Sequence, residues 1–367
     1  MQPRPQLKSY SRRIGESAIA LVPDTGIEFT LEDPEGQVRA LLDLLDGTRT
    51  VDELAVALAA RWPELTTADV VQGVEILDGA GMLEDADAQT TLSSPQQERY
   101  FSNLAFFGTY SSLTRSRYSF QEQLCASRVL LLGVGGLGST LLYNLAGLGV
   151  GYIRLLDYDT VELKNFARQF LYTEADIGRS KIERAAARAR SFNSGLEITV
   201  VERRIEEPED VSPLLQDVDL VLAAVDQPAQ VREWVNDACT PAGVPFVTGG
   251  FQQARGMYWS VDPGRSACQA CWRVASTREG VPSFEQPEPI NRGIGPVASV
   301  LGSLVALEAL RYLTRFAEPV SAGKIWLVDF ASGQVEPAFE WPKLPDCPVC
   351  APAGADHPQV AVAAQRG

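Results

Sequence analysis

The chain has 367 residues, of which 45% are hydrophobic and 22% charged, values of a globular protein long enough for two domains. Lys and Arg total 32 against 47 Asp and Glu, a formal net charge of −15. So acidic a chain is repelled by phosphate backbones and anionic lipid surfaces, which argues against nucleic acid and membrane as partners. The single histidine, His357, lies in a tail rich in Ala and Pro, which excludes Ser-His-Asp triads, Cys-His pairs and multi-histidine metal sites.

The sequence gives no sign of export or membrane insertion. Its start, MQPRPQLKSYSRR, lacks the apolar core of a signal peptide, and no uninterrupted apolar run approaches the roughly 20 residues that span a bilayer. We therefore expect a cytoplasmic location. In that reducing compartment, the two C-x-x-C pairs are predicted to bind a metal rather than to form disulfides.

The first 92 residues differ in composition from the rest, with 7 basic and 17 acidic side chains. Their pattern predicts a β-hairpin over 18–32 and helices over 36–46, 50–62 and 66–83. Thr50 with Glu53, and Thr66 with Asp69, have the spacing of capping boxes at two helix starts. A hairpin and three short helices predict a small winged-helix-like α+β domain over 1–90, followed by a polar linker over 91–98.

Beyond the linker the pattern changes to that of an α/β domain. Near-continuous apolar runs cover 127–138, 152–159, 196–204 and 218–226. Separated by helical stretches, such runs predict parallel strands buried on both faces. Further strands are expected over 244–250, 256–262 and 323–330, and a helix over 297–313. We therefore predict a Rossmann-like, mainly parallel sheet over 99–352, a Pro- and Glu-rich loop between Thr277 and Gly295, and a flexible tail over 353–367.

A glycine-rich turn, Gly133-Val-Gly135-Gly136-Leu-Gly138, follows the first of these strands and opens a helix. Glycines there let phosphate oxygens approach the N–H groups of the helix N-terminus. Asp157 ends the next strand, where a carboxylate can accept hydrogen bonds from ribose hydroxyls. From these residues alone, a nicotinamide-dependent dehydrogenase fits as well as an ATP site.

Three charged residues favour a triphosphate. Arg168 and Lys181 place two cations beyond the strand end, more than a single pyrophosphate requires. Asp226 is at the carboxyl end of the buried strand over 218–226, at the edge where open α/β sheets bind ligands, and its carboxylate can hold Mg²⁺ against phosphates. The simpler alternatives are a surface salt bridge for Lys181 and a helix cap for Asp226.

Four cysteines form two C-x-x-C pairs, Cys268 with Cys271 and Cys347 with Cys350, and no histidine lies in the 75 residues between the pairs. Four thiolates in a tetrahedral array form a closed, structural zinc site. Catalytic zinc is not expected. Cys125 and Cys239 are interpreted as small core residues.

These residues together resemble the ThiF/MoeB/HesA adenylyltransferases, relatives of ubiquitin-activating enzymes. The resemblance covers about Gln97 to Pro352 and rests on GVGGLGS, LLDYDTVELKNFARQ, DIGRSK, CQAC, IGPVASVLGSLVALEAL and CPVC, in family order. It implies an ATP-dependent adenylyltransferase with a Rossmann-like fold, working as a homodimer whose active site is partly shared. ATP and Mg²⁺ are the implied cofactors, beside structural Zn²⁺.

The resemblance also implies roles for individual residues. Asp157 would bind the ATP ribose, Asn165, Arg168 and Lys181 would contact the triphosphate, and Asp226 would coordinate Mg²⁺. The same nucleotide site would include Gly133, Gly135, Gly136, Gly138, Asp159 and Gln169.

Two departures from the family pattern bear on catalysis. The stretch EPINRG lacks the cysteine with which many relatives form a thioester or persulfide, which argues against a cysteine relay. Ser102 stands where family members often carry an arginine that reaches into the partner's ATP site. Either Arg99, Arg115 or Arg117 substitutes for it, or the enzyme is slow or inactive.

The N-terminal domain has a resemblance of its own, over about 15–88, to PqqD-type elements that bind the leader of a ribosomal precursor peptide. It implies a peptide strand added beside the segment 19–31, against a helix near 68–77. The two parts together resemble microcin-C-type maturation enzymes and predict adenylation of a precursor-peptide carboxylate in natural-product biosynthesis. The alternatives are a non-catalytic leader-binding partner of a cyclodehydratase and a sulfur-carrier-protein adenylyltransferase; for the N-terminal domain alone, a dimerisation or DNA-binding winged helix.

Overall fold

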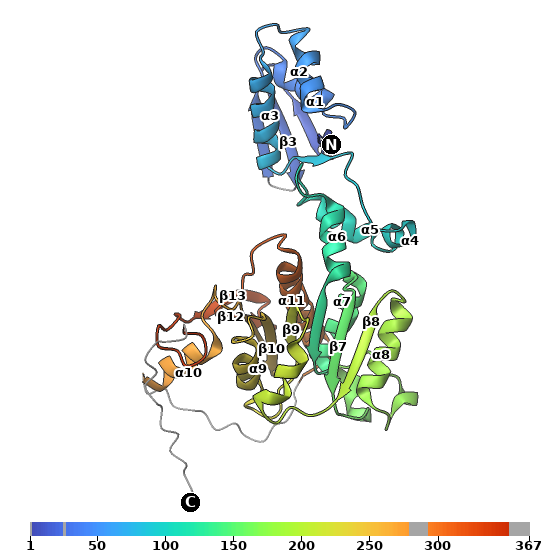
Figure 1. Cartoon of the computed structure of the whole chain (residues 1–367), viewed down its shortest axis with the longest axis vertical. Coiled ribbons are helices and arrows are strands. Elements are labelled where there is room, and N and C mark those ends of the chain that lie inside the picture. The colour runs from blue at the N-terminus through green and yellow to red at the C-terminus, as the bar shows by residue number, and fades with distance from the viewer. Residues whose placement is uncertain (1, 25–26, 279–292, 352–367) are drawn as a thin grey trace, which may run out of the picture. The chain divides into compact units, whose positions relative to one another are not determined.

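The computed structural model describes residues 2–24, 27–278 and 293–351. It contains two compact units, Met1–Gln123 and Leu124–Gly367 (Figure 1). The predicted tail over 353–367 and most of the predicted loop between Thr277 and Gly295 lie outside the described residues.

The first unit holds two small sheets and a set of short helices. Its elements are β1 (Pro5–Leu7), β2 (Ser11–Ile14), β3 (Ala18–Asp24), β4 (Ile27–Glu32), α1 (Gln37–Leu44), α2 (Val51–Ala59), α3 (Thr67–Gly79), β5 (Leu83–Asp85), α4 (Ser94–Arg99), α5 (Phe101–Gly108) and α6 (Arg117–Ala126), which runs past the unit's end. Strands β3 and β4 form the predicted hairpin, and the three predicted helices are α1 to α3. Strand β2 pairs with β3 and makes a three-stranded sheet, β2-β3-β4, while β1 pairs with β5; these additions were not predicted.

Both predicted capping boxes are present. The Thr50 hydroxyl accepts from the Glu53 N–H at 3.4 Å, and the Glu53 carboxylate accepts from the Thr50 N–H at 2.8 Å. Thr66 and Asp69 exchange the same bonds at the start of α3. Each box satisfies backbone N–H groups that a helix start leaves without partners, which stabilises it by about 1 kcal/mol. The helices therefore begin where their apolar faces can pack on β3.

A buried lysine fastens the segment after α3 to the same unit. The Lys8 ammonium donates to the carbonyls of Gly81 and Ser111, both at 2.7 Å, and to that of Thr109 at 3.3 Å. The compact unit therefore runs on to Gln123, and helix α4 occupies most of the predicted linker. The predicted division into a domain over 1–90 and a linker over 91–98 stays a prediction.

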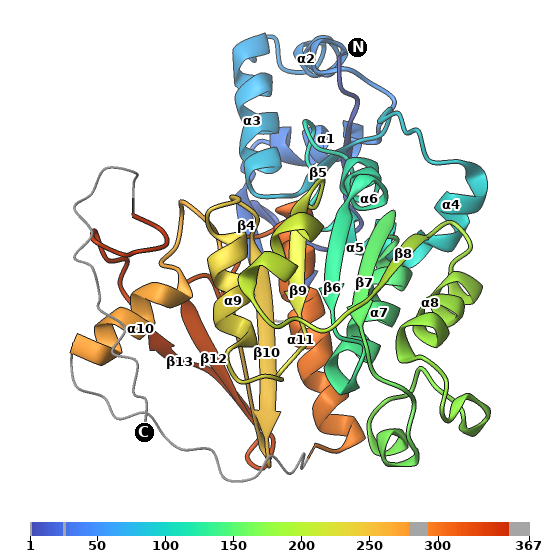
Figure 2. The same cartoon turned by 60° about the horizontal axis from the view of Figure 1, so that its bottom comes forward.

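The second unit is built on one eight-stranded sheet. Its elements are β6 (Arg128–Leu132), α7 (Gly136–Leu148), β7 (Tyr152–Asp157), α8 (Lys181–Phe192), β8 (Glu197–Glu202), β9 (Leu220–Ala223), α9 (Val231–Cys239), β10 (Phe246–Gln252), β11 (Arg255–Val261), α10 (Gln269–Arg278), α11 (Gly295–Thr314), β12 (Lys324–Asp329) and β13 (Gln334–Glu340). The strand order is β13-β12-β11-β10-β9-β6-β7-β8; β10 through β8 are parallel, and β10 through β13 antiparallel. Helix α9 lies in front of the sheet and α11 behind it in Figure 2. This is the predicted mainly parallel, Rossmann-like α/β fold.

The strand order fixes where a ligand can bind. From β6 the chain moves to β7 on one side, and β9 flanks β6 on the other. In open α/β sheets such a reversal leaves a crevice at the carboxyl ends of the central strands. Here that crevice lies between the segments that follow β6, β7 and β9.

Helix α11 is the one described helix long and apolar enough to cross a membrane, with 67% of its most apolar window buried. Gly, Ser and Glu interrupt its apolar residues, so its sequence has no uninterrupted apolar run of that length. It packs against α7 and β10, as the core helix of a folded domain does.

Candidate active site

The glycine-rich turn after β6 requires glycine at two positions. Gly133 has a φ of +89°, and a Cβ added to Gly138 would lie 2.0 Å from the Gly133 carbonyl oxygen. Only residues without a side chain allow this close turn between strand and helix. Gly135 is the N-cap of α7, and its missing side chain leaves the first N–H groups of the helix open to an anion.

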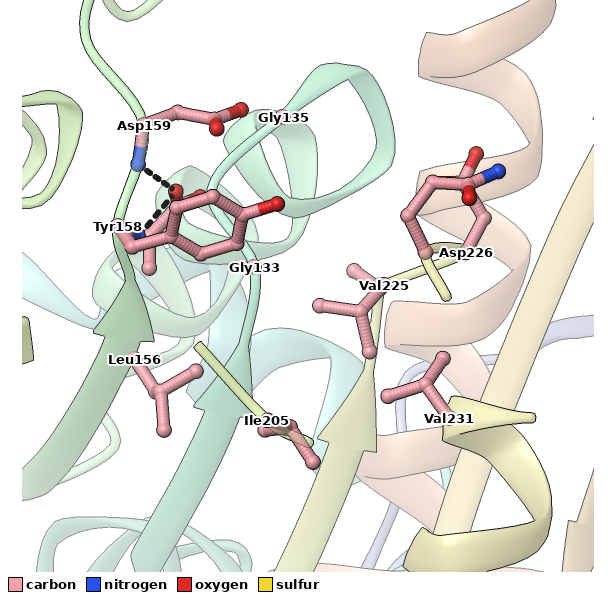
Figure 3. Close-up of a pocket in the computed structure, with 12 residues that line it drawn as sticks. Gly133, Gly135, Leu156, Tyr158, Asp159, Ile205, Val225, Asp226 and Val231 are labelled. Atoms are coloured by element: carbon pink, nitrogen blue, oxygen red, sulfur yellow. Dashed lines mark hydrogen bonds between the residues drawn. The ribbon is translucent and has the colours of Figure 1, made fainter. Parts of the chain in front are cut away.

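A pocket opens at the carboxyl ends of the three central strands (Figure 3). Five residues singled out from the sequence line it: Gly133, Gly135, Asp157, Asp159 and Asp226. Its other lining residues were missed: Leu156, Tyr158, Ile205, Ala224, Val225, Gln227 and Val231. Six of them lie within or next to the predicted strands, and Val231 opens α9, so the sequence signal that could have found the six is their position rather than their chemistry.

Backbone N–H groups hold Asp157 in place. One carboxylate oxygen accepts from Val134 at 2.8 Å, and the other from Tyr158 at 2.7 Å and Asp159 at 2.9 Å. A carboxylate offers about four acceptor positions, so one remains for a ribose hydroxyl. The carboxylate thus joins the ends of β6 and β7 and keeps a hydrogen-bonding edge toward the pocket.

Lys181 is held at the pocket by Asp159 and does not itself line it. The Lys181 ammonium lies 2.7 Å from the Asp159 carboxylate, with 5% of the lysine side chain exposed and 49% of the aspartate. Lys181 is the first residue of α8, where the helix dipole disfavours a cation, so the Asp159 charge compensates it. The alternative of a salt bridge is therefore present, but its lysine is buried and its aspartate half exposed at the pocket.

Three other predicted residues surround the glycine turn without lining the pocket. The Asn165 side chain accepts from the Glu162 N–H at 2.9 Å and so closes the turn that carries the other two. The Arg168 side chain packs against the turn: a Cβ added to Gly136 would lie 3.3 Å from its Cγ and Cδ atoms. Gln169 is buried beside Gly135, and its side-chain carbonyl oxygen accepts no hydrogen bond from the described residues.

Asp226 follows β9 with its side chain exposed. It does not cap α9, whose N-cap is Gln230, so the alternative role is wrong. Within the described ranges, no hydrogen-bond donor or ion-pair partner contacts its carboxylate. The pKa of Arg232 nearby is lowered, mainly by burial, although the Asp226 charge acts to raise it. An unengaged carboxylate at this strand end fits a divalent cation.

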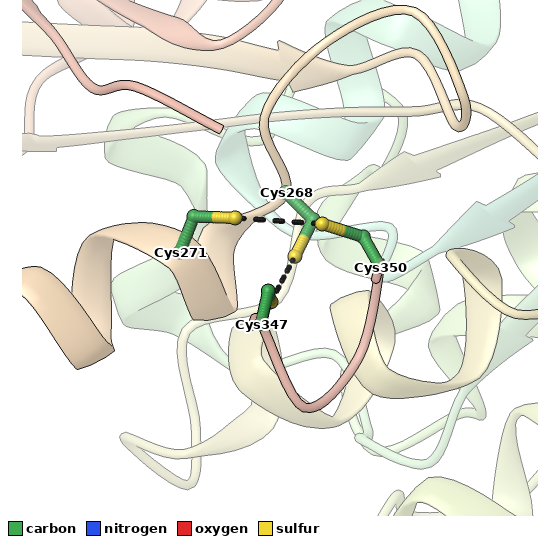
Figure 4. Close-up of side chains that lie close together, drawn as sticks. All are labelled: Cys268, Cys271, Cys347 and Cys350. Carbon is green, nitrogen blue, oxygen red and sulfur yellow. Dashed lines mark hydrogen bonds between the residues drawn. The ribbon is translucent and has the colours of Figure 1, made fainter. Parts of the chain in front are cut away.

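The four predicted cysteines converge where the start of α10 meets the segment 347–350 (Figure 4). The sulfurs of Cys268 and Cys347 lie 3.6 Å apart, those of Cys271 and Cys350 3.4 Å, and all four lie within 4.8 Å of one another. A tetrahedral zinc ion with 2.3 Å bonds to sulfur sets its ligands about 3.8 Å apart, so the cluster fits zinc. The Cys268 thiol donates to Cys271 and lowers the pKa of that thiol to about 5. Cys239, on α9, belongs to the same buried core cluster but is not one of the four, and burial raises its pKa.

The chain is similar to known proteins over most of its length. The family model described as the ThiF family matches residues 108–349, about two thirds of the chain. The chain belongs to the ThiF family. Members of the family are ATP-dependent adenylyltransferases, so the predicted enzyme class is confirmed and the dehydrogenase alternative is wrong.

Two curated members show how far the sequence likeness reaches. Molybdopterin-synthase adenylyltransferase of Escherichia coli is 35% identical over 233 residues, which are 63% of this chain and 89% of that protein. The sulfur carrier protein ThiS adenylyltransferase of Escherichia coli is 33% identical over 239 residues, 64% of this chain and 90% of that protein.

The fold likeness to solved structures covers nearly the whole chain. MccB of Escherichia coli, solved with the peptide MccA-N7isoASN, matches 94% of this chain and 99% of its own, with a TM-score of 0.75 and 20% identity. MccB solved with ATP matches 95% and 99%, with a TM-score of 0.73 and 20% identity. The predicted likeness to a microcin-C-type maturation enzyme is thus confirmed at the level of the fold.

Proposed function

We propose that this ThiF-family enzyme captures a ribosomal precursor peptide through its first unit and adenylates a carboxylate of that peptide. The observation that carries the proposal is the joining of the two units in one chain. The likeness to MccB covers 94% of the chain, whereas the family model matches only from residue 108 on and leaves out most of the first unit. MccB has been solved with its peptide MccA and with ATP, which supports both substrates here.

The hairpin of the first unit supplies a candidate peptide edge. Strand β2 pairs with the outer edge of β3. Among the described strands, none pairs with the outer edge of β4, so that edge of the hairpin is open. Phe29 on β4 is 37% exposed and Ile76 on α3 is 59% exposed. Main-chain bonds along β4 and apolar contacts with these side chains fit an added peptide strand.

The chemistry needs charge neutralisation more than proton transfer. The peptide carboxylate, already anionic, attacks the α-phosphorus of ATP; a P–O bond forms, and the bond to the leaving pyrophosphate breaks. Asp157 orients the ribose, while Arg168, Lys181 and the N–H groups at Gly135 offset the phosphate charge. Lys181 must then share its ammonium between Asp159 and a phosphate oxygen.

Two metals accompany this proposal. Asp226 would hold Mg²⁺, which supplies positive charge to the phosphates when bound. Zn²⁺ on the four cysteines would be structural, because all four positions of a tetrahedral ion are taken by protein sulfurs and none is left for substrate.

A homodimer would complete the site. Ser102 replaces the arginine of the family pattern. Of the substitutes considered, Arg117 pairs with Glu84 at 3.1 Å, and the Arg115 guanidinium lies 3.8 Å from the Phe120 ring centroid. Around the nucleotide site of the second unit, the apolar side chains of Leu163 and Phe170 are 68% and 60% exposed. Such side chains fit burial by a second copy, in the cytoplasm where ATP is available.

ATP–pyrophosphate exchange with candidate peptides tests the proposal. Exchange should depend on a peptide with its leader, and Phe29→Glu should raise the KM for the peptide while leaving the KM for ATP unchanged. No exchange with any peptide, together with calorimetric binding of the leader but not of ATP and Mg²⁺, would favour the non-catalytic leader-binding partner.

The curated relatives favour one rival, activation of a sulfur-carrier protein. A small β-grasp protein ending in Gly-Gly should then support exchange better than any peptide, and Phe29→Glu should have no effect. That result would leave the adenylyltransferase assignment intact and remove the peptide.

A further inference from the structure

The open edge of β4 presents two different faces to an added strand. Phe29 and Leu31 stand opposite Leu21 and Ile19 of β3, two residues of the buried core. Residues opposite one another in an antiparallel pair lie on the same face of the sheet. Phe29 and Leu31 therefore lie on the core face of the hairpin, and the alternate positions 28, 30 and 32 lie on its outer face.

The outer face of β4 is acidic, since Glu28 and Glu32 are both exposed there, on either side of Thr30. Arg13 lies on the same face, opposite Ala20, and its guanidinium is 3.1 Å from the Glu28 carboxylate. This pair leaves 74% of the arginine side chain and 42% of the glutamate side chain exposed. Within the described ranges, no cation or hydrogen-bond donor contacts the Glu32 carboxylate. The edge thus carries one unpaired carboxylate and one in a solvent-exposed pair, which contributes little by itself.

The rest of this part of the chain has the same sign of charge. Ion pairs engage four of the seven basic side chains in residues 1–92, and a fifth, Lys8, donates to backbone carbonyls. Most of the 17 acidic side chains there therefore have no cation beside them. Such a surface attracts a cationic partner and repels an anionic one before any contact forms.

We propose that the peptide strand held at β4 is basic, with Lys or Arg opposite Glu28 and Glu32 and apolar residues opposite Phe29 and Leu31. This inference rests on the proposed function and specifies the chemistry of its precursor peptide. Because an added strand alternates its side chains as β4 does, the recognised pattern is basic-apolar-any-apolar-basic. The pattern is the same in both directions, so it holds for a parallel and for an antiparallel strand.

Two synthetic peptides test the pattern on the full chain. One contains KVTVK and the other EVTVE, within identical fluorescently labelled flanks of Gly and Ser. In fluorescence anisotropy at about 50 mM salt, the KVTVK peptide should bind about tenfold more tightly, and the ratio should fall as the salt is raised to about 500 mM. The opposite preference, or equal binding at low salt, would overturn the basic pattern.

Charge reversal at the edge separates local recognition from net charge. Glu32→Lys should weaken binding of the KVTVK peptide and strengthen binding of the EVTVE peptide, each by roughly threefold, a result that misfolding cannot produce. Glu64→Lys is the matched control, because it changes the net charge equally at an exposed position between α2 and α3. Equal effects of the two variants would show attraction by net charge alone and would overturn the placement opposite Glu32.

Phe29→Glu distinguishes failure of this inference from failure of the proposed function. Both peptides should lose affinity in this variant if they bind along β4. Tight binding of the EVTVE peptide that Phe29→Glu abolishes would leave the peptide edge standing and remove the basic pattern. Binding of neither peptide to the unaltered chain, or binding that ignores Phe29→Glu, would overturn the peptide edge of the proposed function together with the pattern.

Discussion

Replacing Gly138 by alanine should destabilise the protein, whereas the same replacement of a glycine elsewhere in α7 should not. The added Cβ would lie 2.0 Å from the Gly133 oxygen, and Cβ atoms essentially never come within 3.0 Å of a backbone atom, so the turn must open by about 1 Å. Such overpacking costs roughly 1–3 kcal/mol. For a unit of this size it lowers the melting temperature by about 2–4 °C per kcal/mol.

Gly147→Ala, in the last turn of the same helix, is the matched control. There the nearest atom to the added Cβ is Phe192 Cε1 at 3.8 Å, an ordinary contact. Alanine is a better helix former than glycine by about 0.8–1.0 kcal/mol, so this variant should melt slightly above the unaltered chain.

ATP binding should separate the two variants further. A displacement of about 1 Å in a binding turn can cost roughly 100-fold in rate, so we expect Gly138→Ala to lose at least tenfold in affinity for ATP, and Gly147→Ala to lose none. Scanning calorimetry and ATP titration give both quantities. Equal melting temperatures and equal ATP affinities for the two variants would refute the tight turn.

Three further outcomes are expected. Lys8→Met should destabilise the first unit to denaturant by about 2 kcal/mol, since the Ser111 and Thr109 carbonyls lose their buried donor; unchanged unfolding would contradict those bonds. Burial alone would raise the pKa of Asp176, but hydrogen bonds from Thr173 and Arg184 outweigh it and lower the pKa. Its stabilisation is therefore present above about pH 4 and lost as the pH falls through the folded-state pKa, so in pH-dependent melting Asp176→Asn should lose less stability on acidification. Cys347→Ser should lower the zinc content by mass spectrometry from one per chain and destabilise the second unit, whereas Cys125→Ser should retain the metal.

The second unit was predictable from sequence because its central strands are buried on both faces. Continuous apolar runs such as 128–132 and 220–223 leave little choice of secondary structure, and each predicted strand is present. The antiparallel edge strand β13 was missed. All seven of its residues are exposed, so it has no apolar periodicity to detect.

The candidate site was predictable at positions where only one residue type can serve. Glycines that cannot bear a Cβ and an aspartate at a strand end have sequence signatures, and Gly133, Asp157 and Asp226 do line one pocket. The partnership of Asp159 with Lys181 and the contact of Arg204 with Tyr158 join residues 22 and 46 positions apart. Pairs of this kind depend on how strand ends meet in space, which local pattern does not encode.

The central claim is that the chain transfers the adenylyl group of ATP to a carboxylate at the pocket that contains Asp226. Mass spectrometry of a peptide incubated with the enzyme, ATP and Mg²⁺ tests it most directly. The account predicts a peptide heavier by one adenylyl group, pyrophosphate in equal amount, and neither product with Asp226→Asn. A peptide that gains a phosphate instead, or full adenylation by Asp226→Asn, would contradict it.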